Sequence, residues 1–577
     1  MKKFITILLA LAMILAMSIP AFADNEAETA TVTIAKTDDI DRTYEAFKLL
    51  DLKVSHKDTG AGHDYSCPVD PETGAVYHVS ECFNYNYNIA NAAYLAILQE
   101  EVMEHTATPF WTALGVPAPE NKEAITEDQI LKYLETLQGD DGSNYSTLRK
   151  TADRIYRQIQ ANGTLTGVVM TANVAKDLEQ GYWMIVETTA GLDEYAAKSV
   201  VMLATNAQDN ITIQPKSALP QMEKKVKDID DSEHITTLDQ PWQDSADHDI
   251  GDTIPFKLTA TLPANMDSFN PYKLIFHDTM DEGLQLIPGS FKVYLYSNKV
   301  VADADNNMDN SVTLTTPLFV APTTGGPDIY VENDLYKIEL NTADGCDFEF
   351  TIKDAKKLPG VAVGNAIVIT YQAKLTGNVI LGETGNANSA YMEFSNDPYD
   401  VTATGKTLED TVKVFTYGLT IDKQDDQGHP LNLAGFTLQK FSSEADDYVN
   451  VGEELKGTDL APMTTFQWIG LDDGDYRLIE STVPDGYNEM APIDFTILPV
   501  HSATASDPEL TAINCVVMGN GDLATGMISR AVVNHTGTAL PETGAEGTFL
   551  LITGGTMLVI LASVFMITRK KMSIYED

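Results

Sequence analysis

Apolar and polar positions alternate one by one along most of the chain from Thr31 onward, with turn residues between the alternating segments. The stretches TVTIAKTDD, FKVYLYS and YGLTIDKQDD are examples. Successive side chains of a strand point to opposite faces, so a period of two predicts strands that are buried on one face. The chain is therefore expected to be mainly β-sheet.

A helical pattern interrupts this alternation between about positions 80 and 161. Thr126 and Gln129 have the spacing of a capping box, and Ile125 and Ile130 have that of a hydrophobic staple. Further along, apolar residues recur with the period of a helix at Leu148, Ala152, Ile155 and Ile159. The first β-rich region is therefore predicted to carry a helical insertion.

Three β-rich regions follow one another along the chain, at residues 24–215, 222–410 and 411–537. Each begins with a similar strand that contains lysine: TVTIAKTD, QMEKKVKD and GLTIDKQD. This weak repeat suggests three related β-sandwich domains in tandem. Pro215 and Pro220 bracket the first junction, which leaves residues 216–221 as a linker.

The first residues have the pattern of an export signal. Lys2 and Lys3 precede a short apolar run, and Ala21-Phe22-Ala23 is a small-residue cleavage site. Residues 1–23 are therefore predicted to be a secretory signal peptide.

At the other end, a short polar motif precedes an apolar run. The run at 549–567 is long enough to cross a bilayer as a transmembrane helix, and the basic residues 569–571 hold its end in the cytoplasm. The motif is LPETG, made of Leu540, Pro541, Glu542, Thr543 and Gly544. This order resembles the cell-wall sorting signal of Gram-positive surface proteins, here residues 538–577. The resemblance implies that a sortase cuts after Thr543 and passes its carbonyl to an amine, which anchors the protein to peptidoglycan.

Composition excludes several classes of function. The 577 residues carry a formal net charge of -46, and no basic cluster occurs outside the two ends, so nucleic acid is not expected as a partner. No HExxH, G-x-S-x-G or P-loop pattern is present, and we expect no turnover active site, cofactor or metal centre. The stretch DADNNMDNS has calcium-loop spacing but lacks the glycine and the closing glutamate, which favours a solvated turn.

Four cysteines are present, and none forms a CxxC pair. Cys67 and Cys82 could close a disulfide loop, which export would permit. Free buried thiols are an equal alternative, also for Cys346 and Cys515.

Three polar residues fall on predicted core faces in the third region. Lys423 is in phase with Leu419 and Ile421, Glu480 is in phase with Tyr476 and Leu478, and Asn534 is in phase with Val532. An unpaired charge is costly to bury, so these groups either reach solvent at strand ends or satisfy one another. A desolvated lysine amine can attack an asparagine amide beside a protonated acid, which expels ammonia and leaves an isopeptide bond.

These segments resemble a known family. LTIDKQD, YRLIESTVPDGY and VVNHTGTALPETG are similar to the last domain of Gram-positive backbone pilins, whose E-box reads YxLxETxAPxGY. The residues that match are Tyr476, Leu478, Glu480, Pro484, Gly486 and Tyr487. Ser481 and Val483 depart from the pattern. The resemblance implies immunoglobulin-like sandwiches of the Cna type, with Lys423 bonded to Asn534 and Glu480 as the promoting acid.

The middle region also has a lysine on the predicted core face of a strand. Lys224, rather than Lys225, is in phase with Met222 and Val226. GNANSAYMEFSNDP resembles the closing strand of the middle pilin domain, which implies a bond from Lys224 to Asn388, with Asp278 as the acid. Asn396 lies on the same face and is an alternative partner.

In the first region, Lys36 and Glu187 are each in phase with the apolar positions of their own strand, so both are expected to face the core. Asn210 is out of phase and Asn206 precedes the last strand. We therefore expect an ordinary ion pair between Lys36 and Glu187 and no isopeptide bond.

The family's pilin motif ends in YPK, and NITIQPKSALP offers Lys216 with Gln214 in place of the tyrosine. Lys216 is in register with Thr212 and Gln214, so its side chain is expected to face solvent. The resemblance implies that Lys216 is the acceptor amine for Thr543 of the next copy; an ordinary surface lysine is the alternative.

The expected function is that of a structural pilus backbone subunit, secreted and anchored to the wall of a Gram-positive bacterium. The resemblance implies as partners a class C pilus sortase, a housekeeping sortase, other copies of this chain, ancillary pilins and peptidoglycan. A monomeric wall-anchored adhesin or ancillary pilin is the alternative. A hydrolase would need a cleft with convergent catalytic groups, which no motif supplies.

Overall fold

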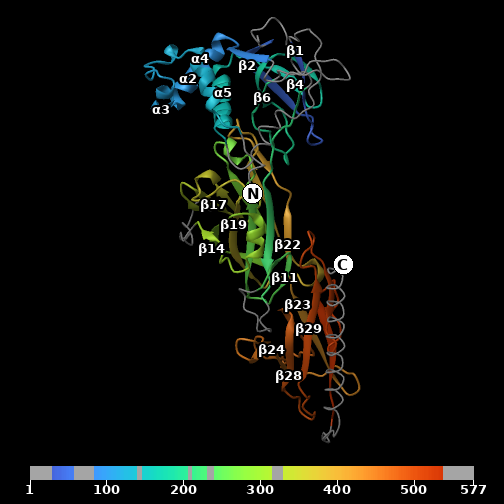
Figure 1. Cartoon of the computed structure of the whole chain (residues 1–577). Helices are drawn as coiled ribbons and strands as arrows, with labels where there is room; N and C mark the ends of the chain where they lie inside the picture. The colour runs from blue at the N-terminus through green and yellow to red at the C-terminus, as the bar shows by residue number, and fades with distance from the viewer. Residues whose placement is uncertain are drawn as a thin grey trace, which may run out of the picture.

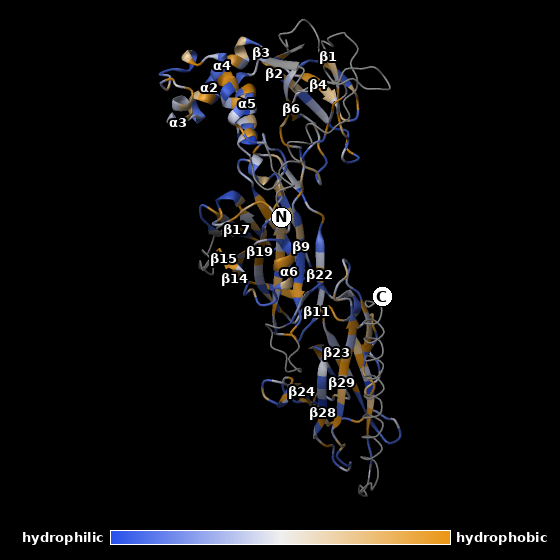
Figure 2. Cartoon of the chain, viewed as in Figure 1, coloured by the Kyte–Doolittle hydropathy of each residue, from blue (hydrophilic) through white to orange (hydrophobic). Residues whose placement is uncertain are grey.

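The computed structural model describes residues 29–56, 83–139, 146–205, 211–229, 240–314 and 329–536. Three β-sandwich domains follow one another along an elongated molecule (Figure 1). We refer to residues 29–213 as the first domain, 221–415 as the middle domain and 417–536 as the third domain. Most of the described elements are strands arranged in sheets, so the predicted all-β fold class is confirmed; hydrophobic and hydrophilic residues both occur along these strands (Figure 2).

The first domain holds two small sheets. One has the order β5 (Lys176–Glu179), β1 (Thr29–Ile34), β8 (Ile211–Ile213), with β8 parallel to β1. The other has the order β3 (Phe83–Ile89), β2 (Thr43–His56), β6 (Gly181–Glu187), β7 (Met202–Thr205), with β4 (Val168–Thr171) also paired to β2.

The predicted helical insertion is present in this domain. It comprises α2 (Ala92–His105), α3 (Thr108–Ala113), the 3-10 helix η1 (Lys122–Ala124), α4 (Glu127–Thr136) and α5 (Thr147–Asn162). The capping box of α4 forms as expected, since the Thr126 hydroxyl accepts from the Gln129 N–H and the Gln129 side chain accepts from the Thr126 N–H. Ile125 and Ile130 are both buried. Local sequence signals therefore determine where this helix begins.

The middle domain packs two larger sheets face to face over one apolar core. The first sheet has the order β10 (Trp242–Gln243), β9 (Gln221–Lys227), β12 (Thr253–Thr261), β19 (Ala366–Leu375), β14 (Leu284–Tyr296), β15 (Val312–Thr313). The second has the order β11 (Ser245–Asp247), β22 (Asp410–Phe415), β20 (Asn386–Ser395), β13 (Leu274–Met280), β18 (Phe348–Ile352), β17 (Tyr336–Leu340), β16 (Ile329–Glu332), with β21 (Thr404–Lys406) on β20.

Short helices complete this domain: α6 (Lys299–Ala304), η2 (Met266–Ser268), η3 (Ala355–Lys357) and η4 (Gly382–Thr384). The strand that follows the expected boundary at residue 410 is β22, which hydrogen-bonds to β20. Residues 411–415 therefore lie in a sheet of the middle domain.

The third domain is a smaller sandwich. Its three-stranded sheet has the order β27 (Thr465–Leu471), β23 (Tyr417–Asp425), β31 (Met527–Asn534). The opposite sheet has the order β25 (Asp447–Asn450), β24 (Gly435–Ser442), β28 (Gly474–Thr482), β29 (Ile493–His501), β30 (Leu510–Asn514), with β26 (Leu455–Lys456) on β24. The first and last strands, β23 and β31, run parallel side by side.

Ionisable side chains are buried where the middle and third domains meet. The Lys440 ammonium donates across the junction to Asp249 at 2.6 Å, and within the third domain to Asp472 at 3.3 Å. His501 lies 3.3 Å from an oxygen of Asp247. The third domain is therefore held to the middle domain by polar contacts as well as by the chain.

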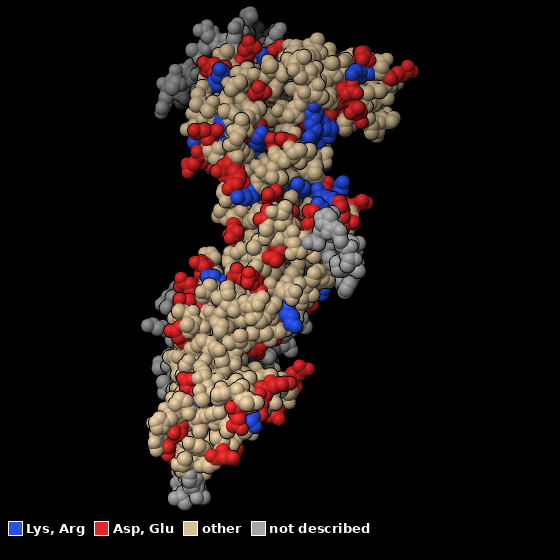
Figure 3. Space-filling model, turned by 180° about the vertical axis from the view of Figure 1, so that it is seen from behind, with Lys and Arg blue, Asp and Glu red and all other residues tan. Residues whose placement is uncertain are grey.

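Charge is unevenly distributed over the surface. In Figure 3, acidic side chains are spread along the visible face, whereas lysines and arginines gather mainly at the first domain and its junction with the middle domain. A cavity at that junction is lined by basic and acidic side chains together: Lys150, Arg154, Arg157, Lys356, Asp153 and Asp267.

Several sequence predictions lie outside the described residues: the signal peptide, the LPETG sorting signal, Cys67, Cys82, Asn206 and Asn210. The apolar run at 549–567 is also outside them. Among the described residues, no helix is long and apolar enough to span a membrane. Cys346 and Cys515 are buried free thiols.

Candidate cross-linking sites

The third domain brings Lys423, Glu480 and Asn534 into one buried cluster. The Lys423 ammonium lies 2.7 Å from Asn534 Oδ1, and Asn534 Nδ2 donates to Glu480 Oε1 at 2.8 Å. All three residues are at most 2% exposed. The three polar residues that alternation placed on core faces therefore contact one another rather than solvent.

The register of the strands explains why Lys423, Glu480 and Asn534 lie together. In the parallel pair, Lys423 on β23 lies opposite Val532 of β31, one pleat from Asn534. Glu480 comes from β28 in the opposite sheet, and its second oxygen accepts from the Met490 N–H at 2.8 Å. The acid thus reaches across the core to a pair formed by neighbouring strands.

The electrostatics of this cluster favour an uncharged amine. Burial lowers the pKa of Lys423, while the nearby Glu480 charge acts in the opposite direction. The acid contacts the amide nitrogen rather than the amide carbonyl, since Glu480 accepts from Asn534 Nδ2. That nitrogen is the atom that would leave as ammonia.

The middle domain contains a second buried cluster with the same three functional groups, namely an amine, a carboxyl group and a carboxamide. Lys224 on β9 donates to Asp278 on β13, and the Asp278 oxygen also accepts from the Tyr371 hydroxyl at 2.6 Å. The same hydroxyl accepts from the Lys224 ammonium at 2.7 Å and from Asn388 Nδ2 at 3.0 Å. All four side chains are fully buried.

Burial shifts both ionisable partners of this cluster toward their neutral forms. It lowers the pKa of Lys224 and raises that of Asp278, and it outweighs their mutual attraction, which acts in the opposite direction on each. Within the described part of the chain, Asp278 Oδ1 and Asn388 Oδ1 have no hydrogen-bond partner. The cluster therefore contains a carboxyl oxygen and an amide carbonyl oxygen that are buried without a hydrogen bond.

Tyr371 was missed at the level of sequence. It lies in the apolar strand β19, AIVITYQAKL, and its ring stacks on Phe256 at 5.4 Å between centroids. The only signal available was a hydroxyl at a position in phase with Ile369 and Ala373, where such a group needs a partner.

Asn396 does not join this cluster. It follows the end of β20, and its Nδ2 donates to the Ala196 carbonyl of the first domain at 3.2 Å. Of the two alternatives, the structure brings Asn388 to the Lys224 cluster.

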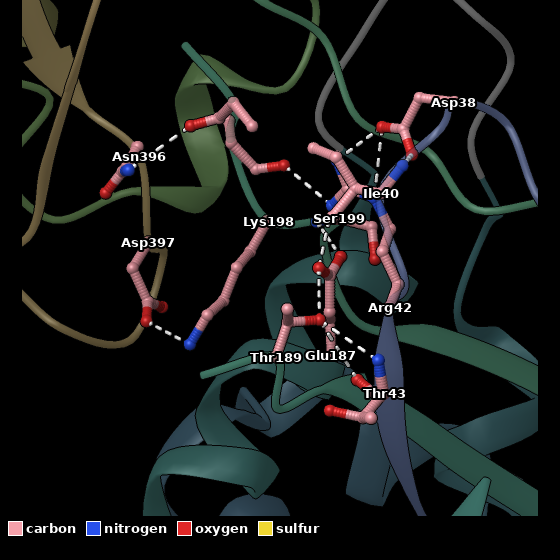
Figure 4. A network of polar contacts seen from close by, with 12 residues as sticks. Asp38, Ile40, Arg42, Thr43, Glu187, Thr189, Lys198, Ser199, Asn396 and Asp397 are labelled. Carbon is pink, nitrogen blue, oxygen red and sulfur yellow. Dashed lines mark hydrogen bonds and ion pairs between the residues drawn. The ribbon is translucent and has the colours of Figure 1, made fainter. Parts of the chain in front are cut away.

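In the first domain, the predicted pair between Lys36 and Glu187 is wrong. Strand β1 ends at Ile34, so Lys36 is exposed and pairs with Asp41 at 2.9 Å. Glu187 is buried and instead accepts from Arg42 at 2.7 Å (Figure 4).

This Glu187 network has further partners. The Thr189 hydroxyl donates to Oε1 at 2.8 Å, and the Ser199 N–H donates to Oε2 at 2.6 Å. Figure 4 also shows Lys198 reaching Asp397 of the middle domain, at 2.6 Å. An arginine thus takes the role that alternation assigned to a lysine, because it enters the core from the loop before β2.

Lys216 is exposed, as its phase predicts, and lies in the segment between β8 and β9. Its backbone carbonyl accepts from the Val200 N–H at 3.1 Å. The side chain is therefore presented from a backbone that is held at the junction of the first and middle domains.

The stretch with calcium-loop spacing forms a turn that satisfies itself. Asp305 accepts from the backbone N–H groups of Asn307, Asp309 and Asn310. Its carboxylate therefore closes the loop after α6.

Two segments match known family models. Residues 418–508 match a prealbumin-like fold domain, and residues 532–573 match the LPXTG cell wall anchor motif. No curated protein sequence matches the chain.

Solved structures similar to this chain include three bacterial pilins. The T6 backbone pilin of Streptococcus pyogenes is 14% identical, with a TM-score of 0.48, over 89% of this chain and 100% of that one. The major pilin SpaD of Corynebacterium diphtheriae is 15% identical, with a TM-score of 0.38, over 90% and 100%. The major pilin BcpA of Bacillus cereus is 15% identical, with a TM-score of 0.36, over 65% and 91%.

The anchor motif, next to a prealbumin-like domain, marks the chain as a cell-wall-anchored surface protein of the Gram-positive type. Its resemblance to sortase-assembled backbone pilins, first drawn from the motifs around Glu480 and LPETG, is supported by both matched segments.

Proposed function

We propose that this chain is the backbone subunit of a covalently polymerised pilus. A class C sortase cleaves between Thr543 and Gly544 and transfers the Thr543 carbonyl to the Lys216 amine of another copy. A housekeeping sortase attaches the completed fibre to peptidoglycan, and ancillary pilins join it. The anchor motif at 532–573 and the exposure of Lys216 support this assembly.

The proposal is carried by the two buried lysine–acid–asparagine clusters. In each, the neutral lysine amine attacks the asparagine Cγ, the Nζ–Cγ bond forms, and the Cγ–Nδ2 bond breaks. The leaving nitrogen departs as ammonia, with the carboxyl group relaying the proton. Close contact within a rigid core supplies the proximity that a separate enzyme would otherwise provide.

The two bonds would connect different parts of their domains. Lys224 and Asn388 lie on opposite sheets of the middle sandwich, whereas Lys423 and Asn534 lie on adjacent parallel strands. In the middle domain, burial raises the pKa of Asp278, which favours the acid in its neutral form. Both bonds tie an early strand to a late one, so neither domain can extend under tension.

Geometry limits where the acceptor lysine sits. The described chain ends at Thr536, seven positions before Thr543. Seven extended residues reach at most about 24 Å, so Lys216 of the next copy must approach the end of β31 within that distance. This end lies at the far end of the molecule from the first domain (Figure 1), which favours head-to-tail stacking.

Polymerisation is tested by expressing the chain with its pilus sortase and separating cell-wall extracts on denaturing gels. Wild type is expected to give a ladder of high-mass species, and Lys216→Arg is expected to abolish it. Lys176→Arg, at an exposed lysine on β5 of the first domain, is the matched control and should leave the ladder intact. An unchanged ladder in Lys216→Arg would refute this linkage, and a monomeric wild type would favour a wall-anchored adhesin.

A further inference from the structure

A second polar cluster lies on the outer face of the middle domain, away from the cross-linking site. His277 follows Phe276 on β13 and has the opposite parity to the core residue Asp278. The imidazole is 6% exposed, and its ring stacks on Tyr391 of β20, with centroids 4.4 Å apart and planes 3° from parallel. The loop between β17 and β18 supplies Asp344 and Cys346 to the same place.

Sulfur, nitrogen and oxygen donors converge in this cluster. Cys346 Sγ lies 3.9 Å from His277 Nδ1 and 3.4 Å from Asp344 Oδ2. The same Asp344 oxygen lies 3.2 Å from His277 Nδ1. Glu349, which faces His277 from β18, places an oxygen 3.8 Å from that nitrogen.

These separations suit one particular coordination geometry. Zinc binds cysteine, histidine and carboxylate ligands in a tetrahedron, at about 2.0 to 2.3 Å from the metal. Ligand atoms at such bond lengths lie about 3.3 to 3.6 Å apart along the edges of the tetrahedron. The sulfur, nitrogen and Asp344 oxygen are already within a few tenths of an ångström of those edges. Asp344 is exposed, which leaves the fourth corner to solvent.

The loop holds its donors in place without a metal. Gly345 has a φ of +96°, which a residue with a Cβ rarely adopts, and this allows the sharp turn between the two ligands. The Thr342 N–H donates to the Cys346 carbonyl, and the Asp347 N–H donates to the Asp278 carbonyl. The loop is therefore fixed at both ends to the strands beneath it.

The second imidazole nitrogen supports a ligand role for the first. His277 Nε2 is buried and has no hydrogen-bond partner among the described residues, while a Glu393 oxygen lies 3.8 Å away. Metal-binding histidines commonly direct their other nitrogen at a carboxylate, which orients the ring. This arrangement turns Nδ1 toward the cysteine and the aspartate.

The Cys346 thiol is buried, and its sulfur faces the His277 imidazole and the Asp344 carboxylate. The other buried thiol described, Cys515, belongs to the core of the third domain.

We propose that His277, Asp344 and Cys346 bind one zinc-class divalent cation, with solvent as the fourth ligand. On binding, a metal–sulfur bond replaces the S–H bond and the thiol proton passes to solvent. The cation joins β13 to the loop between β17 and β18, so it fastens that loop to the sheet that carries Asp278.

Metal titration of the purified, exported chain tests this site. One equivalent of Zn²⁺ is expected to bind, and Co²⁺ should give visible absorption typical of tetrahedral cobalt with a near-ultraviolet thiolate-to-metal band. Cys346→Ser should abolish that band, whereas the matched control Cys515→Ser should retain it. Circular dichroism of each variant verifies that it is folded.

A second variant tests the orienting carboxylate. Glu393→Gln is expected to weaken Zn²⁺ binding by about 10- to 100-fold, since it removes the charge beside Nε2. Glu332→Gln, at the edge strand of the same sheet, should leave the affinity unchanged. Absence of saturable Zn²⁺ uptake by wild type, or a thiolate band that persists in Cys346→Ser, would overturn the proposal and leave a hydrogen-bonded polar cluster only.

Discussion

Substitution of Glu480 by glutamine isolates the chemistry of the third-domain bond from its packing. Glutamine keeps the shape of the side chain and an oxygen that can accept from Asn534 Nδ2, the contact that Glu480 makes at 2.8 Å. It cannot carry the proton that the leaving nitrogen needs. We therefore expect Glu480→Gln to fold with Lys423 and Asn534 in contact but unbonded.

The size of the effect follows from the loop that the bond closes. Lys423 and Asn534 are 111 positions apart. A cross-link that closes a loop of roughly 100 residues lowers the conformational entropy of the unfolded chain. This stabilises the folded domain by about 4.7 kcal/mol. At about 2.1 cal/mol/K per residue, a domain of about 120 residues has a melting entropy of about 0.25 kcal/mol/K. The third domain should therefore melt about 20 °C lower without its bond.

Intact-mass spectrometry and calorimetry measure the two consequences. Wild type should weigh two ammonia molecules less than its sequence, and Glu480→Gln one molecule less than its own sequence. The melting transition of the middle domain should stay in place, because that domain keeps its own cluster. Glu454→Gln, an exposed carboxylate held by Ser481 and Thr482 in the same domain, is the matched control and should lose both molecules.

Two results would refute the reasoning. A Glu480→Gln chain that still loses two ammonia molecules would show that the acid is not needed. A wild-type chain of full sequence mass would show that Lys423 and Asn534 only hydrogen-bond.

Two further predictions concern the middle domain and its junction with the third. Asn388→Ala should remove one ammonia loss from the mass spectrum, whereas Asn396→Ala should remove none; the reverse result would make Asn396 the partner. Burial beside Asp247 raises the pKa of Asp228 to about 7, so the folded chain keeps a proton that the unfolded chain releases near pH 4. The stability from this proton is complete below about pH 4 and is lost as pH rises through about 7. The melting temperature should therefore fall from pH 5 to pH 8, less steeply in Asp228→Asn than in the exposed-site control Asp494→Asn; equal slopes would contradict this assignment.

Strand alternation predicted the third-domain cluster because each member interrupts a regular core face. Lys423, Glu480 and Asn534 lie in strands whose neighbouring inward positions are apolar, so parity alone places them inside. The capping signals of α4 could also be predicted, because they involve residues only a few positions apart in the sequence.

Other contacts depend on where a strand ends or on residues far away in the chain. Lys36 continues the parity of β1, but the strand stops at Ile34, and Arg42 enters the core from the following loop. Tyr371 looks like an ordinary aromatic residue of an apolar strand. Its role becomes visible only when β13 and β20 are placed opposite it, across the core. His277 and Cys346 are 69 positions apart, and only the sheet register brings them together.

The parallel pairing of β23 and β31 has a consequence for how the protein survives outside the cell. With Lys423 joined to Asn534, the chain between them becomes a closed ring that both termini enter at neighbouring points. A protease that cuts any one peptide bond inside this ring opens it without dividing the molecule. Release of a fragment from either ring would need a second cut, whereas the first domain and the segment 389–422 lie outside the two rings.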